Sequence, residues 1–125
     1  MALLFESFQE WKAYCNDGQL ELWQPVLTYE ISQKGKTEET IWKNLQIAWD
    51  VMKDAVNTGL TEEMKSVSGM INDGAKKVYQ YEKAVLSPEF QKLVARALAA
   101  KEVNSCMGRV VAAPTAGASG ILPGT

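Results

Sequence analysis

Apolar residues in the first third of the chain recur at helical spacing. A first stripe, spaced by four, three and four positions, consists of Leu4, Phe8, Trp11 and Cys15. It predicts an amphipathic helix, which the Asn-Asp-Gly run at 16–18 ends because these residues favour turns. A second stripe at spacing four consists of Trp23, Leu27 and Ile31. It predicts a helix over 22–34 that is stopped by Gly35 and holds Pro25 close to its first turn.

The third helical pattern is the clearest. Thr37 is a capping residue, and the two glutamates at 38–39 suit the positive end of a helix dipole. The apolar face that follows consists of Ile41, Trp42, Leu45, Ala48, Trp49, Met52, Ala55 and Val56. We expect this helix to end at the Asn-Thr-Gly run at 57–59 and to anchor the core. We expect that core to include the three tryptophans of these stripes: Trp23, Trp42 and Trp49.

The second half of the chain continues the helical pattern. A loop over 66–74 leads to a fourth predicted helix over 75–86. The Ser-Pro-Glu run at 87–89 then starts a fifth helix that extends toward Met107, because serine caps, proline fits the first helical position and glutamate meets the dipole. No period-2 strand pattern is convincing. The fold class is therefore all-α, with about five amphipathic helices followed by a glycine-rich loop.

The composition changes after Glu102. The last 23 residues, 103–125, carry a single charge, Arg109, together with four glycines and two prolines. Such a segment is too apolar for a solvated linker, so we expect it to be buried. Its stretch over 113–120 has glycines that can adopt positive φ and backbone N–H groups that can point at an anion, such as a carboxylate.

Composition and charge narrow the class of protein. The chain has 125 residues, 46% of them hydrophobic and 22% charged, which is typical of one compact soluble domain. Lys and Arg number 13 against 15 Asp and Glu, and only two are arginines, which argues against a nucleic-acid partner. No apolar run approaches the roughly 20 residues of a membrane span, and no signal-peptide core is present, so we expect a cytoplasmic protein and no membrane partner.

The residue types also limit the chemistry. The chain has no histidine, which removes Ser-His and Cys-His pairs and histidine metal sites. Cys15 and Cys106 are too far apart in sequence for a metal knuckle, and we expect both to be reduced. Neither a phosphate-binding P-loop nor a GxGxxG motif nor a hydrolase elbow is present. The residues alone leave open an enzyme and a helical interaction module without catalytic activity.

The glycine-rich end carries a resemblance to a known family. The stretch 104–124, Asn-Ser-Cys-Met-Gly-Arg-Val-Val-Ala-Ala-Pro-Thr-Ala-Gly-Ala-Ser-Gly-Ile-Leu-Pro-Gly, resembles the signature of the iron-sulfur-dependent L-serine dehydratases (L-serine ammonia-lyases), and most closely that of their α (catalytic) chain. The Ser-Val-Ser-Gly-Met run at 66–70, followed by Asp-Gly-Ala-Lys-Lys at 73–77, is similar to a second loop of that family. The resemblance implies a lyase of serine catabolism and gluconeogenesis that converts L-serine to pyruvate and ammonia.

The resemblance also implies a cofactor and partners. A 4Fe-4S cluster is expected, with one iron acting as a Lewis acid on the β-hydroxyl of serine. In the family, the cluster's cysteines follow the stretch that Gly124 closes. We therefore expect residues 1–125 to be a truncated N-terminal helical part of the catalytic domain, with no metal ligands and incomplete on its own. The partners implied are L-serine and a β chain of the same enzyme, in a homo- or hetero-oligomer.

The resemblance suggests which residues bind the substrate, while leaving the catalytic residues unidentified. The expected substrate-binding residues are Ser68, Asn104, Thr115, Ala116, Gly117, Ser119 and Gly120. We expect the hydroxyls of Thr115 and Ser119, with the N–H groups of 116–120, to hold the substrate carboxylate or line the cluster pocket. For each hydroxyl and amide the alternative is structural: a turn hydroxyl bonded to nearby backbone at Ser68, Thr115 and Ser119, and a helix cap at Asn104.

Overall fold

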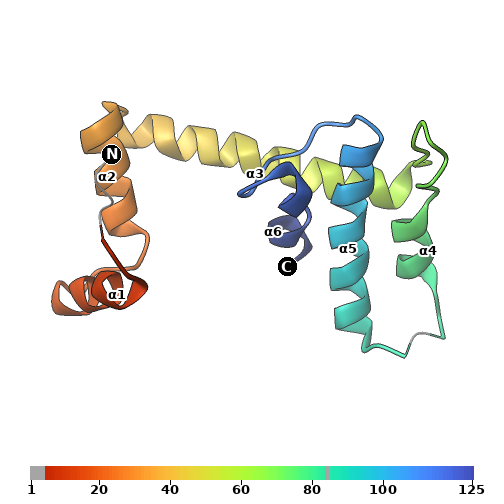
Figure 1. Ribbon diagram of the computed structural model, residues 1–125, viewed down its shortest axis with the longest axis horizontal. Helices are drawn as coiled ribbons and strands as arrows, with labels where there is room; N and C mark the ends of the chain where they lie inside the picture. Colours follow the sequence, from red (N-terminus) through yellow and green to blue (C-terminus); the bar gives the residue numbers. More distant parts are fainter. Residues whose placement is uncertain (1–4, 84) are drawn as a thin grey trace. The chain divides into compact units, whose positions relative to one another are not determined.

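The computed structural model describes residues 5–83 and 85–125. Within these ranges the regular secondary structure is helical, apart from one isolated bridge between Lys65 and Asn72. The elements in chain order are α1 (Phe8–Asp17), α2 (Gln24–Lys34), α3 (Glu38–Thr61), α4 (Gly74–Gln80), α5 (Pro88–Ser105), the 3-10 turn η1 (Ala116–Ala118) and α6 (Ile121–Gly124) (Figure 1). The all-α prediction is confirmed. The chain divides into two compact units, 1–45 and 46–125, so α3 contributes to both.

The first unit contains α1 and α2. The Ser7 hydroxyl accepts a hydrogen bond from the N–H of Glu10 at 3.2 Å and so begins α1, as a capping residue should. The predicted first helix is confirmed over 8–17, whereas Leu4 of its stripe lies outside the described residues. The second helix begins at Gln24, two residues later than predicted, because Pro25 fits only the first turn of a helix. It ends as predicted at Gly35, which adopts a left-handed φ of 60°.

The long helix α3 begins as predicted and ends later. The N–H of Thr40 donates to the Thr37 hydroxyl at 3.2 Å, which caps the helix. The expected stop at 57–59 is wrong, because Gly59 lies inside the helix, where it permits a close approach. A Cβ at Gly59 would lie 2.5 Å from the carbonyl oxygen of Ala99 on α5. This glycine therefore serves helix packing rather than helix termination.

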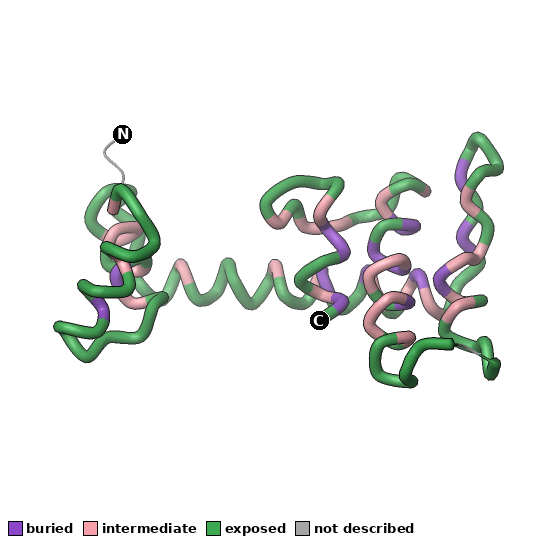
Figure 2. Tube along the Cα trace, turned by 60° about the horizontal axis from the view of Figure 1, so that its bottom comes forward, coloured by how far each residue is buried: buried purple, intermediate pink, exposed green. Residues whose placement is uncertain are grey.

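The second unit is organised around α5. Figure 1 shows α5 between α4 and α6, and Figure 2 shows buried positions on α5 and the elements beside it. Its buried apolar residues have small side chains: Ala95, Ala99, Ala100 and Val103. The apolar cluster of α5 continues onto Ala55 of α3 and onto Met64. The core of this unit is thus built from alanine, valine and methionine.

The fourth helix is shorter than predicted. It ends at Gln80 instead of 86, and position 84 lies outside the described residues. The side-chain amide of Gln91, on α5, donates to the carbonyl oxygens of Val78 at 2.6 Å and Tyr81 at 2.8 Å. These two bonds satisfy carbonyls at the end of α4, and Tyr81 is already extended. The fifth helix starts at its predicted Ser-Pro-Glu signal, where the Ser87 hydroxyl accepts from the N–H of Phe90.

The expectation that the tryptophans form the core is wrong. Trp23 is 49% exposed, and Trp42 and Trp49 are each 45% exposed. Trp23 and Trp42 pack against each other edge to face, with ring centroids 5.5 Å apart. The close crossing at Gly59 and Ala99 leaves room only for small side chains, so the wide rings of the helical stripes lie elsewhere.

None of the helices within 5–83 and 85–125 is long and apolar enough to cross a membrane.

Candidate functional site

The expected substrate-binding residues all lie in the second unit, in three places. Ser68 lies in the loop between α3 and α4, and Asn104 lies in the last turn of α5. The remaining five lie at 115–120, from the start of η1 to the start of α6. The structure brings the segment 115–120 against α5, while no hydrogen bond between described residues joins it to the Ser68 loop.

The glycine-rich segment is held to α5 by a close backbone approach. A Cβ at Gly120 would lie 2.2 Å from the carbonyl oxygen of Ala97, and one at Gly124 would lie 3.0 Å from the Ala97 Cβ. Both glycines are buried, and they sit at the start and the end of α6. The expected positive φ is wrong here: Gly120 has a φ of −88°, and Gly117 is not in the left-handed region either. Glycine is needed at 120 for space alone.

Burial divides the segment into two parts. Ser119 is 2% exposed, and its hydroxyl has no hydrogen-bond partner among the residues described. Thr115, Ala116 and Gly117 are exposed, so the expectation of a wholly buried end is wrong for them. The turn η1 uses the N–H groups of Ala118 and Ser119 and leaves those at 116–117 outside its own hydrogen bonds. The segment therefore offers two N–H groups and one hydroxyl on exposed residues.

The Ser68 loop is closed by hydrogen bonds of its own. Asp73 adopts a left-handed φ of 53°, its N–H donates to the Met64 carbonyl at 3.1 Å, and its Oδ1 accepts from the Met64 N–H at 2.6 Å. Ser66 is buried, and its hydroxyl accepts from the N–H of Ile71 at 3.1 Å. The hydroxyls of Ser66 and Ser68 lie 3.1 Å apart. Ser68 is thus held at the tip of a loop with defined geometry.

The end of α5 contains a buried carboxyl group that the sequence did not single out as a candidate. Asn104 is half-buried, and its carbonyl accepts from the N–H of Met107, which is a helix-end role. Glu102 is 6% exposed, with one carboxylate oxygen accepting from the N–H of Ala75 at 3.2 Å and the other without a partner. Glutamate is almost never buried unless it has a partner, so only the structure could mark this residue.

The residues of this chain do not fit an iron-sulfur cluster. A 4Fe-4S cluster is held by cysteine thiolates, commonly four. Cys15 is buried in the first unit and Cys106 is half-buried in the second. Within the ranges that the structure describes, no group of three or more His, Cys, Asp or Glu side chains could hold a metal ion.

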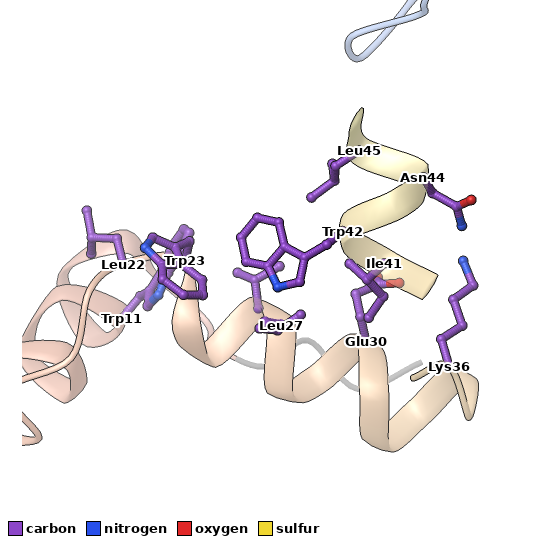
Figure 3. A pocket seen from close by; sticks show the side chains of 11 residues that line it. Trp11, Leu22, Trp23, Leu27, Glu30, Lys36, Ile41, Trp42, Asn44 and Leu45 are labelled. Atoms are coloured by element: carbon purple, nitrogen blue, oxygen red, sulfur yellow. The ribbon is translucent and has the colours of Figure 1, made fainter. Parts of the chain in front are cut away.

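The first unit holds a separate, mostly apolar pocket of about 870 Å³ between α1, α2 and the start of α3 (Figure 3). Its walls include Trp11, Leu22, Trp23, Leu27, Trp42 and Leu45. Figure 3 shows the Trp42 ring directed into the space between α2 and α3, with Lys36 and Asn44 near one end. None of the expected substrate-binding residues lines it. A pocket of this size and composition is typical of sites that receive an apolar group.

Comparison with known proteins gives a consistent family. The model of the family described as serine dehydratase alpha chain matches residues 17–125. The L-serine dehydratase alpha chain of Peptoniphilus asaccharolyticus is 38% identical over 112 residues, which cover 87% of this chain and 38% of that protein. The probable L-serine dehydratase alpha chain of Bacillus subtilis is 31% identical over 125 residues, covering 98% of this chain and 41% of that protein.

A third relative and the solved structures complete the comparison. The L-serine dehydratase of Streptomyces coelicolor is 33% identical over 104 residues, covering 78% of this chain and 22% of that protein. No solved structure matches the chain. The chain spans about two-fifths of the length of the two alpha chains that it matches.

Proposed function

The chain belongs to the serine dehydratase alpha chain family, and from that premise we propose that it is the N-terminal part of the catalytic chain of an iron-sulfur-dependent L-serine ammonia-lyase. The observation that carries this proposal is the family match over 17–125, joined by relatives named L-serine dehydratase alpha chain. The activity belongs to the assembled enzyme, with this chain incomplete and inactive alone. Its setting is cytoplasmic, and a β chain is the proposed partner.

The proposed reaction defines what the protein must hold. L-serine loses its α-proton and its β-hydroxyl as water, and the resulting enamine tautomerises and takes up water to release ammonia and leave pyruvate. The substrate carboxylate keeps its negative charge throughout, so it needs fixed hydrogen-bond donors. The iron-sulfur cluster would take its ligands from outside this segment, as the donor set described above requires.

Within this chain the glycine-rich segment is the proposed carboxylate anchor. The N–H groups of Ala116 and Gly117, with the Thr115 hydroxyl, belong to exposed residues and can donate to an anion at the surface of the second unit. Ser119 and Gly120 seat the segment on α5, and the unpartnered Ser119 hydroxyl gives it one further donor. Ser68, in the loop before α4, and Asn104, in the last turn of α5, complete the proposed set.

The first unit supports a second role, that of an interaction module. Large apolar side chains that line its pocket are half-exposed: Leu22, Trp23, Val26, Trp42 and Leu45. Tryptophan is enriched where proteins bind partners, and open apolar pockets mark such surfaces. In this alternative, the chain is a helical interaction module that binds a partner through this surface and has no catalytic activity.

The proposed activity is tested on the enzyme assembled from this chain and the rest of its catalytic chain. Anaerobically prepared enzyme is supplied with L-serine, D-serine or L-threonine, and the 2-oxo acid and ammonia are measured. The proposal expects equal amounts of pyruvate and ammonia from L-serine. An assembled enzyme that holds its cluster and leaves all three amino acids intact would overturn it, and would leave the interaction module as the better account.

A further inference from the structure

A buried carboxylate connects two elements of the second unit that are far apart in sequence. Glu102 lies in the last turns of α5, and its Oε1 accepts the N–H of Ala75, 27 positions earlier. Ala75 is fully buried, and Glu102 is 6% exposed. Burial of a carboxylate opposes folding unless hydrogen bonds compensate, so a buried glutamate at this contact needs a reason.

The chain makes room for this contact. A Cβ at Gly74 would lie 2.7 Å from Glu102 Oε1, closer than atoms can approach without moving. A methyl group at 74 would push the carboxylate oxygen aside, so glycine lets that oxygen reach the N–H of Ala75 from its present position. The contact depends on three residues: the carboxyl group of Glu102, Gly74 with no side chain, and the buried Ala75.

Glu102 holds the start of α4, which directly follows the loop that carries Ser68. Asp73 directly precedes Gly74 and closes the loop through its two hydrogen bonds to Met64. Met64 itself packs in the apolar cluster with Ala100 and Val103 of α5. The loop is therefore fixed to α5 at both of its ends, by apolar contact at Met64 and by the Glu102 carboxylate just past Asp73.

We propose that Glu102 is a positioning residue, which fixes the 64–73 loop, and with it the Ser68 hydroxyl, against α5 for the dehydration of L-serine. This inference rests on the proposed function, in which Ser68 belongs to the substrate site. The hydrogen bond joins two buried groups, so its loss would leave the N–H of Ala75 without a partner away from water. The second carboxylate oxygen has no partner, so the anchoring uses one oxygen of the two.

Two variants distinguish the effect of losing the hydrogen-bond acceptor from the effect of losing side-chain volume at position 102. Glu102→Gln keeps an oxygen that can accept from Ala75, whereas Glu102→Met fills the same space without an acceptor. Lys101→Met, on an exposed position of the same helix turn, is the matched control. Gly74→Ala disturbs the same contact from the other side, because its methyl group displaces the carboxylate.

Hydrogen exchange on the 125-residue chain tests the anchoring without any need for activity. Glu102→Met and Gly74→Ala should speed amide exchange over 64–75 by about fivefold or more, the effect of losing a buried hydrogen bond, while the middle of α5 stays protected. Glu102→Gln should restore most of the protection, and Lys101→Met should resemble the unmodified chain. Equal exchange in all five proteins would overturn the anchoring role.

Turnover by the assembled enzyme tests the link to the reaction. Glu102→Met should lower kcat/KM for L-serine per folded enzyme, with Glu102→Gln restoring much of it, whereas a purely structural role would change only the amount of folded enzyme. Faster loop exchange with unchanged kcat/KM would overturn the catalytic part of the inference. If the unmodified enzyme itself forms no pyruvate, the proposed function fails instead, and the exchange result still decides whether Glu102 anchors the loop.

Discussion

Replacing Gly120 by alanine should detach α6 from α5. The added Cβ would lie 2.2 Å from the Ala97 carbonyl oxygen and 3.0 Å from the Ala97 carbonyl carbon. Both are backbone atoms in the middle of a helix, so neither can swing aside as a side chain would. Relief requires the 119–124 segment to move by about 1 Å, and such overpacking costs about 1–3 kcal/mol.

The same chain provides a matched series. A Cβ at Gly117 meets nothing closer than the Thr115 hydroxyl at 3.8 Å, so Gly117→Ala should change the free energy of unfolding by no more than about 0.5 kcal/mol. Gly124→Ala, with its nearest contact at 3.0 Å, should be intermediate. The expected order of destabilisation is therefore 120, then 124, then 117.

Urea unfolding followed by circular dichroism measures these differences, and hydrogen exchange over 116–125 locates them. Gly120→Ala should expose the amides of α6 while α3 and α4 remain protected. If Gly120→Ala proves as harmless as Gly117→Ala, then α6 does not pack on α5 in solution. The close approach at Ala97 would then not be the reason for glycine at this position.

Three further substitutions have defined outcomes. The hydrogen bond from Lys53, with a second from Gln46, lowers the pKa of Asp50. The stability that this carboxylate gives α3 is therefore present above the ordinary pKa of aspartate and is lost as the pH falls through the lowered pKa. Lys53→Met should raise the pKa of Asp50 in an NMR titration, and an unchanged pKa would contradict the pairing. Trp49→Ala should cost no more than about 1 kcal/mol in urea unfolding because the ring is 45% exposed, and a loss of about 3 kcal/mol or more would show that it is buried. Ser119→Ala removes a buried hydroxyl without a partner, so the chain should keep or gain stability. In the assembled enzyme the KM for L-serine should rise. A clear loss of stability would mean that the hydroxyl has a partner within the fold.

Local signals in the sequence predicted the helices well where capping chemistry is explicit. The Ser-Pro-Glu run at 87–89 and the left-handed Gly35 mark helix ends that the structure reproduces. The errors occur where tertiary contacts override local preference. Gly59 is a packing contact instead of a helix end, and Gln91 ends α4 from a neighbouring helix.

The candidate site was predicted less completely. The role of the glycine-rich segment in substrate binding stays a prediction, and the structure adds the close backbone approach at Gly120. The segment has an exposed part and a buried part, and the buried part is the one that packs against Ala97 of α5. The spacing of apolar residues in the sequence does not indicate which residues make that contact. Glu102 was missed because a lone glutamate near the end of a helix is usually solvated, and only the position of Ala75 reveals its burial.

Anaerobic reconstitution with iron and sulfide, followed by a pyruvate assay with L-serine, tests the central claim most directly. It compares the 125-residue chain with the assembled enzyme that contains it. The assembled enzyme should show the visible absorption of an iron-sulfur cluster and form pyruvate, whereas this chain alone should do neither, because its two cysteines lie in different units and form no ligand group. A stable cluster and pyruvate formation by the 125-residue chain would contradict the account, as would an assembled, cluster-loaded enzyme that leaves L-serine intact.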